Sequence, residues 1–127
     1  MRYLRGTTNY GVFYTHKDSR LIGFVDSDYV RDLDMRKSTT CYVFTLGGGA
    51  ISWRSMLQPT VALSTTEAEY MAAVECAKEA VWLHCLVNEL GVSQDLVKLY
   101  CDNQSAIYLA KIQVFHARTK HIDVSEL

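Results

Sequence analysis

The strongest constraint on the fold is a long helical segment in the middle of the chain. Ser64 is followed three residues later by Glu67, which is a capping-box pattern in which each side chain satisfies a free backbone N–H at a helix start. Apolar residues then recur at helical spacing from Thr65 to Leu90, and Gly91 supplies the stop. A helix of this length must be covered along one side, so the rest of the chain has to supply a packing partner for it.

Glu69 falls on the apolar side of this predicted helix. At about 100° per residue, the apolar side chains form one arc, and Glu69 lies near its middle, while the other charged residues lie opposite or at its edge. The arc contains Ala72, Ala73, Cys76, Ala80, Leu83, Val87 and Leu90. A bare carboxylate there is costly or takes up a proton, so Glu69 needs a cation, a basic partner or a place at the rim of the core. The alternative is a helix-start acid that bends out to water.

Two short apolar runs predict buried strands, and each ends in an aspartate. Leu21–Val25 precedes Asp26, and Val97–Cys101 precedes Asp102. Between them, Thr39–Leu46 and Ala50–Arg54 flank three glycines and predict a β-hairpin, and Gln104–Lys111 predicts a short helix. The order strand, hairpin, long helix, strand, helix indicates an α/β fold with a mixed sheet that carries helices.

The three acids point to a metal site if the two strands are neighbours. The ends of adjacent strands meet at one edge of a sheet, and the start of the helix can bring Glu69 to the same place as Asp26 and Asp102. Three carboxylates repel one another unless a counter-charge is present, and Mg²⁺ prefers carboxylate oxygen. For any single aspartate after a strand, a turn or cap role is the better interpretation. That simpler interpretation is weaker for all three together.

Length, charge and cysteine content narrow the class of protein. At 127 residues the chain is long enough for one domain with a core, and its net charge of −1 does not by itself require a nucleic-acid partner. The four cysteines lack zinc-site spacing and are interpreted as small buried hydrophobic residues in a reducing compartment. We see no signal peptide and no membrane span, and therefore expect an intracellular, cytoplasmic protein.

A basic cluster near the end of the chain is a candidate phosphate contact, with a solvated loop as the alternative; it contains Lys111, His116, Arg118, Lys120 and His121.

Four segments of the sequence closely resemble one known family. They are FVDSDYVRDLDMRKSTT, GGGAISWRSMLQPTVALSTTEAEYMAA, LYCDNQSAIYLA and HARTKHIDV. They resemble the ribonuclease H region of copia-type LTR retrotransposon Pol polyproteins, and the likeness covers nearly the whole chain. It implies a ribonuclease H-like fold, with a mixed five-stranded sheet flanked by helices and a truncated C-terminal helix. It also implies that residues 1–15 are a connector from the upstream reverse transcriptase region and that residues 16–127 are the ribonuclease H-like domain.

The resemblance also implies an activity and a set of site residues. The family holds two Mg²⁺ ions, with Mn²⁺ as a substitute, between four acids, which match Asp26, Glu69, Asp102 and Asp123. The expected reaction is hydrolysis of the RNA strand of an RNA–DNA hybrid during reverse transcription, in a virus-like particle. Nucleic-acid contacts are expected from Lys111, Arg118, Lys120 and His121, and the reverse transcriptase domain of the same polyprotein is the expected partner.

Two other interpretations of the sequence stay open. One is a truncated, non-catalytic retrotransposon remnant that acts at most as a folded scaffold or nucleic-acid-binding module. The other is a different nuclease of the same fold. The sequences of the hairpin and of the helix start are specifically copia-like, which argues against this second alternative.

Overall fold

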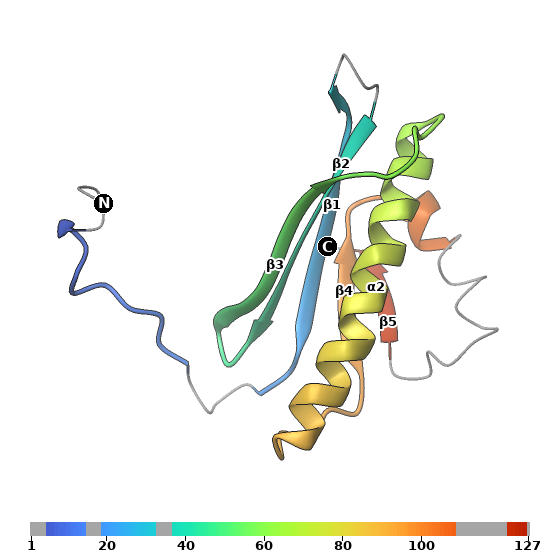
Figure 1. Cartoon of the computed structure of the whole chain (residues 1–127). Helices are drawn as coiled ribbons and strands as arrows, with labels where there is room; N and C mark the ends of the chain where they lie inside the picture. Colours follow the sequence, from blue (N-terminus) through green and yellow to red (C-terminus); the bar gives the residue numbers. More distant parts are fainter. Residues whose placement is uncertain (1–4, 15–18, 33–36, 109–121, 127) are drawn as a thin grey trace.

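A five-stranded mixed sheet with one long helix across a face forms the body of the protein (Figure 1). The structure is a computed structural model, and it describes residues 5–14, 19–32, 37–108 and 122–126. The strands are β1 (Ile22–Asp32), β2 (Lys37–Leu46), β3 (Gly49–Leu57), β4 (Val97–Cys101) and β5 (Ile122–Glu126), and the helix is α2 (Thr65–Glu89). Residues 104–108 are also helical. The predicted fold class is therefore confirmed.

The sheet order is β3-β2-β1-β4-β5, which joins an antiparallel half to a parallel half. β1, β2 and β3 pair antiparallel, whereas β1–β4 and β4–β5 pair parallel. The turn between β2 and β3 consists of Gly47 and Gly48, with φ of 60° and 80°. Two consecutive positive φ angles match the twist of a tight hairpin, and glycine reaches them without steric cost. The predicted hairpin is confirmed, with longer strands than expected.

The long helix matches its prediction closely. The Ser64 side chain accepts a hydrogen bond of 3.1 Å from the backbone N–H of Glu67. Glu67 does not close the box on Ser64, because its carboxylate accepts instead from the N–H of Leu63, at 2.6 Å. At the other end Gly91 adopts φ of 84°, as expected for a helix stop.

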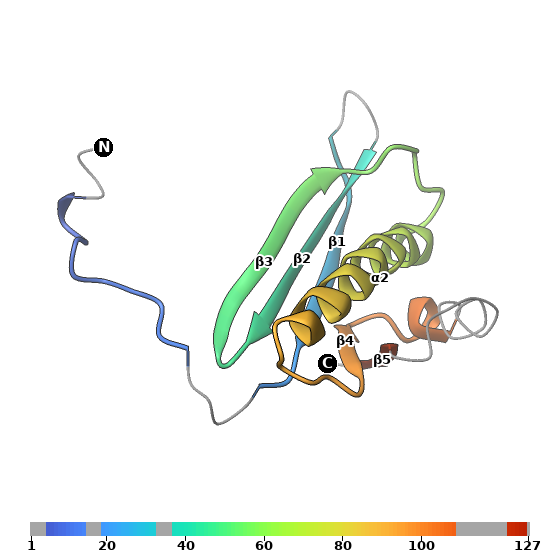
Figure 2. The ribbon, with the colours of Figure 1, turned by 60° about the horizontal axis from the view of Figure 1, so that its bottom comes forward.

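The core lies between α2 and the sheet. Figure 2 shows α2 running along one face of the sheet, where it contacts β1, β2, β4 and β5. The buried helix residues are the predicted arc plus Ala68, with the exception of Leu90, which is 72% exposed at the end of the helix. Leu21, Phe44 and Leu99 are fully buried against this arc. No helix in the described part of the chain is long and apolar enough to cross a membrane.

Candidate metal centre

The parallel pairing of β1 with β4 brings two of the predicted acids side by side. Phe24 pairs with Tyr100 at the end of this ladder, and Asp26 and Asp102 each follow two residues later in the chain. Asp102 directly follows β4, as predicted, but Asp26 lies within β1, because β1 continues in its antiparallel pairing with β2. β1 therefore continues past Asp26 as far as Asp32. Both aspartates are exposed, at the point where the β1–β4 ladder ends.

Glu69 reaches this point from the second turn of α2. It is only 8% exposed, as the helical periodicity predicts. Glu69, Asp102 and Cys101 offer ligand atoms that all lie within 4.8 Å of one another. The alternative in which Glu69 bends out to water is therefore wrong.

The pKa of Glu69 depends on its burial and on its neighbours Ser27, Asp102 and Asp26. Burial raises the pKa of Glu69 above its ordinary value of 4.5, and the nearby charges of Asp102 and Asp26 raise this pKa further, while neighbouring Ser27 lowers it. No ion pair to Asp26, Glu69 or Asp102 is present among the described residues. Three carboxylates therefore lie together without a compensating cation from that part of the chain.

The residues present fit a hard divalent cation. Mg²⁺ prefers carboxylate oxygens, and a charge of +2 offsets the mutual repulsion of the acids. The Ser27 hydroxyl is buried beside Glu69, and hydrogen bonding from Ser27 lowers the pKa of Glu69 and so favours the ionised form that binds a cation. Asp26, Glu69 and Asp102 are the residues that would hold such an ion.

Asp123 does not join this cluster, contrary to the prediction. It lies near the start of β5, where it pairs with Lys98 in the parallel register. Lys98 precedes Asp102 by four residues, so Asp123 is displaced by roughly 13 Å along the strand direction from the level of Asp102. In this register, the strand pairing places the expected fourth acid at the opposite end of the sheet.

The predicted nucleic-acid contacts lie outside the described residues; they are Lys111, Arg118, Lys120 and His121, together with His116. Two residues that lie beside the acids were missed by sequence reasoning, namely Ser27 and Cys101. The signal for Cys101 was its position directly before Asp102 at the end of an apolar strand, which was interpreted only as burial.

Comparison with known sequences connects the chain to mobile elements. It is 56% identical over 124 residues to a retrovirus-related Pol polyprotein from transposon TNT 1-94 of Nicotiana tabacum, covering 98% of this chain and 9% of that protein. It is 40% identical over 126 residues to the Pol polyprotein from transposon RE1 of Arabidopsis thaliana, again covering 98% of this chain and 9% of that protein. The chain is a homologue of retrovirus-related transposon Pol polyproteins. It spans about a tenth of the length of these two relatives.

A third sequence relative is named as a different kind of protein. A third relative is secreted RxLR effector protein 161 of Plasmopara viticola, 50% identical over 84 residues, which are 65% of this chain and 59% of that protein. No protein-family model matches the chain.

Among solved structures, LC11-RNase H1 in complex with an RNA/DNA hybrid aligns with a TM-score of 0.60 and 11% identity, covering 85% of each chain. The N-terminal RNase H domain of rv2228c from Mycobacterium tuberculosis aligns with a TM-score of 0.60 and 9% identity, covering 86% of this chain and 82% of that one. The fold is therefore that of ribonuclease H.

Proposed function

We propose that this Pol-type domain hydrolyses the RNA strand of RNA–DNA hybrids with divalent metal held by Asp26, Glu69 and Asp102. The observation that carries the proposal is the cluster of Glu69 and Asp102 at the end of the β1–β4 ladder of a ribonuclease H fold, with Asp26 close enough to act on Glu69 electrostatically. A related fold has been solved with an RNA/DNA hybrid bound, which supports the substrate class. The proposed setting is reverse transcription, with a reverse transcriptase domain in the same polyprotein as partner.

The three acids have different positions and therefore different tasks. Glu69 is buried and anchored in a long helix, so it fixes one ligand position rigidly. Asp26 and Asp102 are exposed, so their outer oxygens face the side from which a phosphodiester can approach. When bound there, a pair of Mg²⁺ ions supplies an activated water and stabilisation of the leaving oxygen. Recognition of the duplex by its shape, phosphates and 2′-hydroxyls would be completed by the basic residues Lys111, Arg118, Lys120 and His121.

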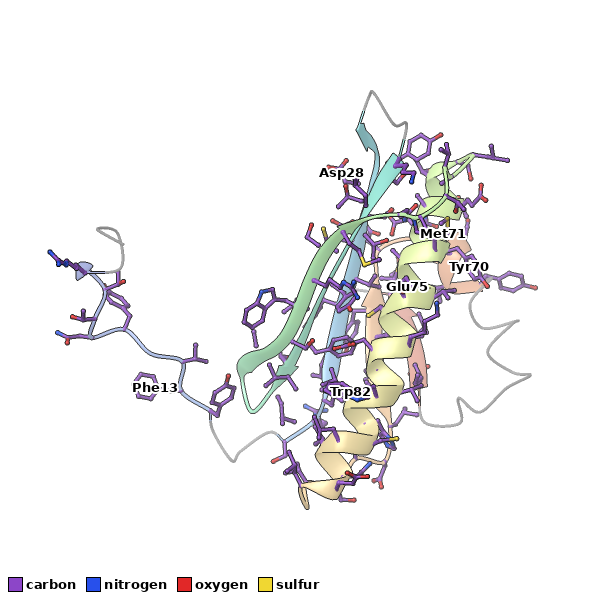
Figure 3. All side chains as sticks on the ribbon, in the orientation of Figure 1. Phe13, Asp28, Tyr70, Met71, Glu75 and Trp82 are labelled. Carbon is purple, nitrogen blue, oxygen red and sulfur yellow. The ribbon has the colours of Figure 1, made fainter. Side chains whose placement is uncertain are left out.

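A cleavage assay on labelled hybrid tests the proposal. The wild-type chain with Mg²⁺ or Mn²⁺ is expected to cut the RNA strand of a hybrid and to leave single-stranded RNA and DNA duplex intact. Asp102→Asn should abolish cleavage, because it removes one charged ligand from the cluster. A matched control is Asp28→Asn, the same exchange at an exposed position nearer to the carboxyl end of β1 (Figure 3). Absence of metal-dependent cleavage by the folded wild-type chain would leave only a scaffold or binding role.

A further inference from the structure

A cysteine thiol lies inside the carboxylate cluster. Cys101 is the last residue of β4 and is fully buried. Its Sγ lies 4.0 Å from Oε2 of Glu69, and one ligand atom from each of Glu69, Cys101 and Asp102 lies within 4.8 Å of the others. The centre therefore combines two carboxylates with one sulfur, rather than oxygen alone.

The position of the thiol follows from the alternation of β4. Val97, Leu99 and Cys101 are buried while Lys98 is exposed, so the Cys101 side chain belongs to the row that packs toward α2. The first turns of α2 bring Glu69 onto the same side. Asp102, the next residue, leaves the strand and offers its carboxylate at the rim. The same strand end thus presents one soft and one hard ligand beside Glu69.

Mixed oxygen and sulfur ligands discriminate between kinds of metal ion. Mg²⁺ takes oxygen ligands in octahedral geometry and has little affinity for sulfur. Zn²⁺ and Cd²⁺ are thiophilic, and a tetrahedral Zn²⁺ site with thiolate and carboxylate ligands needs ligand atoms roughly 3.5 Å apart. The spacing of the Cys101 and Glu69 ligand atoms is close to this value, so small side-chain rotations would complete the set.

We propose that Glu69, Cys101 and Asp102 form an alternative site for a thiophilic divalent cation, of the Zn²⁺ or Cd²⁺ class. On binding, a metal–sulfur bond forms and the thiol proton passes to water, so no oxidant or reductant is needed. Such an ion occupies carboxylates assigned above to Mg²⁺, and so blocks the proposed activity. The inference shares its centre with the proposed function but depends on a different atom, Sγ of Cys101.

Titration with Cd²⁺ tests the inference without measuring cleavage. The background carries Cys41→Ser and Cys85→Ser, which remove the two more accessible thiols. The readouts are the thiolate-to-cadmium charge-transfer absorption in the ultraviolet and the Cd²⁺ dissociation constant, in a reductant that does not bind metal. The chain with Cys101 intact should show this absorption saturating near one ion per chain. Cys101→Ser should lose the absorption and bind Cd²⁺ at least about tenfold more weakly.

Cys76 provides the matched control. It is also fully buried and lies near Cys101, which raises the pKa of Cys76, but it is not a member of the ligand cluster. Cys76→Ser should therefore keep the cadmium absorption. Loss of the absorption in Cys76→Ser with retention in Cys101→Ser would overturn the inference, as would unchanged Cd²⁺ affinity in Cys101→Ser. Cys101→Ala serves as the second variant if the serine variant does not fold.

Mg²⁺ binding separates this inference from the proposed function. Cys101→Ser should retain Mg²⁺ affinity within about twofold, because sulfur contributes nothing to that ion. If wild type binds Cd²⁺ through Cys101 but neither binds Mg²⁺ nor cuts a hybrid, the proposed function fails and the thiophilic site stands. If Mg²⁺ binds and cleavage occurs but the cadmium absorption never appears, the proposed function stands and the thiophilic site fails.

Discussion

The two ends of the β1–β4 ladder are built on opposite principles. At the amino end, polar groups satisfy one another through a network centred on Gln94. At the carboxyl end, the acids Asp26, Glu69 and Asp102 lie close together without a basic partner among the described residues. Both ends belong to the same pair of strands, so the difference lies in the side chains and not in the backbone. The amino end of the ladder therefore contributes to the stability of the fold, whereas the carboxyl end carries the residues of the proposed metal site.

At the amino end, the side-chain and backbone polar groups of Gln94 are paired with neighbouring residues. The side chain of Gln94 accepts from the backbone N–H of Leu21 at 2.8 Å and donates to the carbonyl of Ser19 at 2.5 Å. Its backbone N–H donates to Asn88 Oδ1 at 2.8 Å, and its carbonyl lies 2.9 Å from Nε2 of His84. These bonds tie the end of α2 and the following loop to the start of β1. Satisfied buried groups of this kind stabilise a fold and specify one arrangement.

At the carboxyl end, the burial and mutual repulsion of the acids lower the stability of the metal-free protein. Burial and like charges raise the pKa of Glu69, which means that the folded metal-free protein disfavours the ionised form needed to hold a cation. Departures from local satisfaction of this kind concentrate at functional sites. A bound cation should therefore stabilise the protein by linkage.

The largest expected effect contrasts the same substitution at the two ends. Asp26→Asn should reduce cleavage of a hybrid by more than the roughly 10- to 100-fold that follows loss of a group supporting a metal ligand. Asp123→Asn, near the start of β5, should change the rate by only about twofold. Initial rates at saturating Mg²⁺ measure both. A loss of activity in Asp123→Asn equal to that in Asp26→Asn would show that the functional register of β5 differs from the one described above.

Removal of the Gln94 side chain should act on stability rather than on chemistry. Gln94→Ala leaves the buried N–H of Leu21 without its acceptor, and we expect a loss of about 1–3 kcal/mol in the free energy of unfolding. Urea denaturation without metal measures this. Gln104→Ala is the control at the carboxyl end, because Gln104 bonds Glu126 only at the exposed surface, and its effect should stay within about 0.5 kcal/mol. Equal losses in the two variants would remove the distinction between the ends.

The raised pKa of Glu69 predicts a pH dependence of smaller size. Below the ordinary pKa of 4.5, Glu69 is protonated in both folded and unfolded chains and imposes no penalty. As pH rises, the unfolded chain ionises first, so stability is lost until pH passes the folded pKa. Relative to Glu69→Gln, the metal-free wild type should therefore become less stable as the pH rises above the ordinary pKa of 4.5. Unfolding midpoints of both chains, compared at each pH, measure this, and a constant difference would contradict it.

The smallest expected effect is that of Ser27→Ala. The Ser27 side chain is small and its hydrogen bonding lowers the pKa of Glu69, so its removal should cost less than about 1 kcal/mol of metal-free stability. This is a buried polar-to-alanine exchange like Gln94→Ala, with a smaller loss of stability expected. The stabilisation that Mg²⁺ confers should fall in this variant. Thermal denaturation with and without Mg²⁺ distinguishes the result from a purely structural role, in which both midpoints would drop together.

Local physics made several features predictable from sequence. The cap at Ser64, the stop at Gly91 and the burial of Glu69 follow from helix periodicity and from end groups a few residues apart. The Gly47-Gly48 turn likewise follows from the φ angles that a tight hairpin demands. The choice of Glu69 over Glu67 as the site acid needed only the angle between side chains around one helix axis.

Pairing between distant segments decided the rest. Asp26 meets Asp102 because β1 lies parallel to β4, and Asp123 is separated from them because β5 starts level with β4. Neither register is encoded near the residues concerned, since each depends on how whole strands share the face beneath α2. The same holds for Cys101, a buried hydrophobic residue by sequence that only the docking of α2 turns into a neighbour of Glu69. Short-range hydrogen bonds and periodicity shape the elements, whereas the convergence of side chains on one point is a property of their packing.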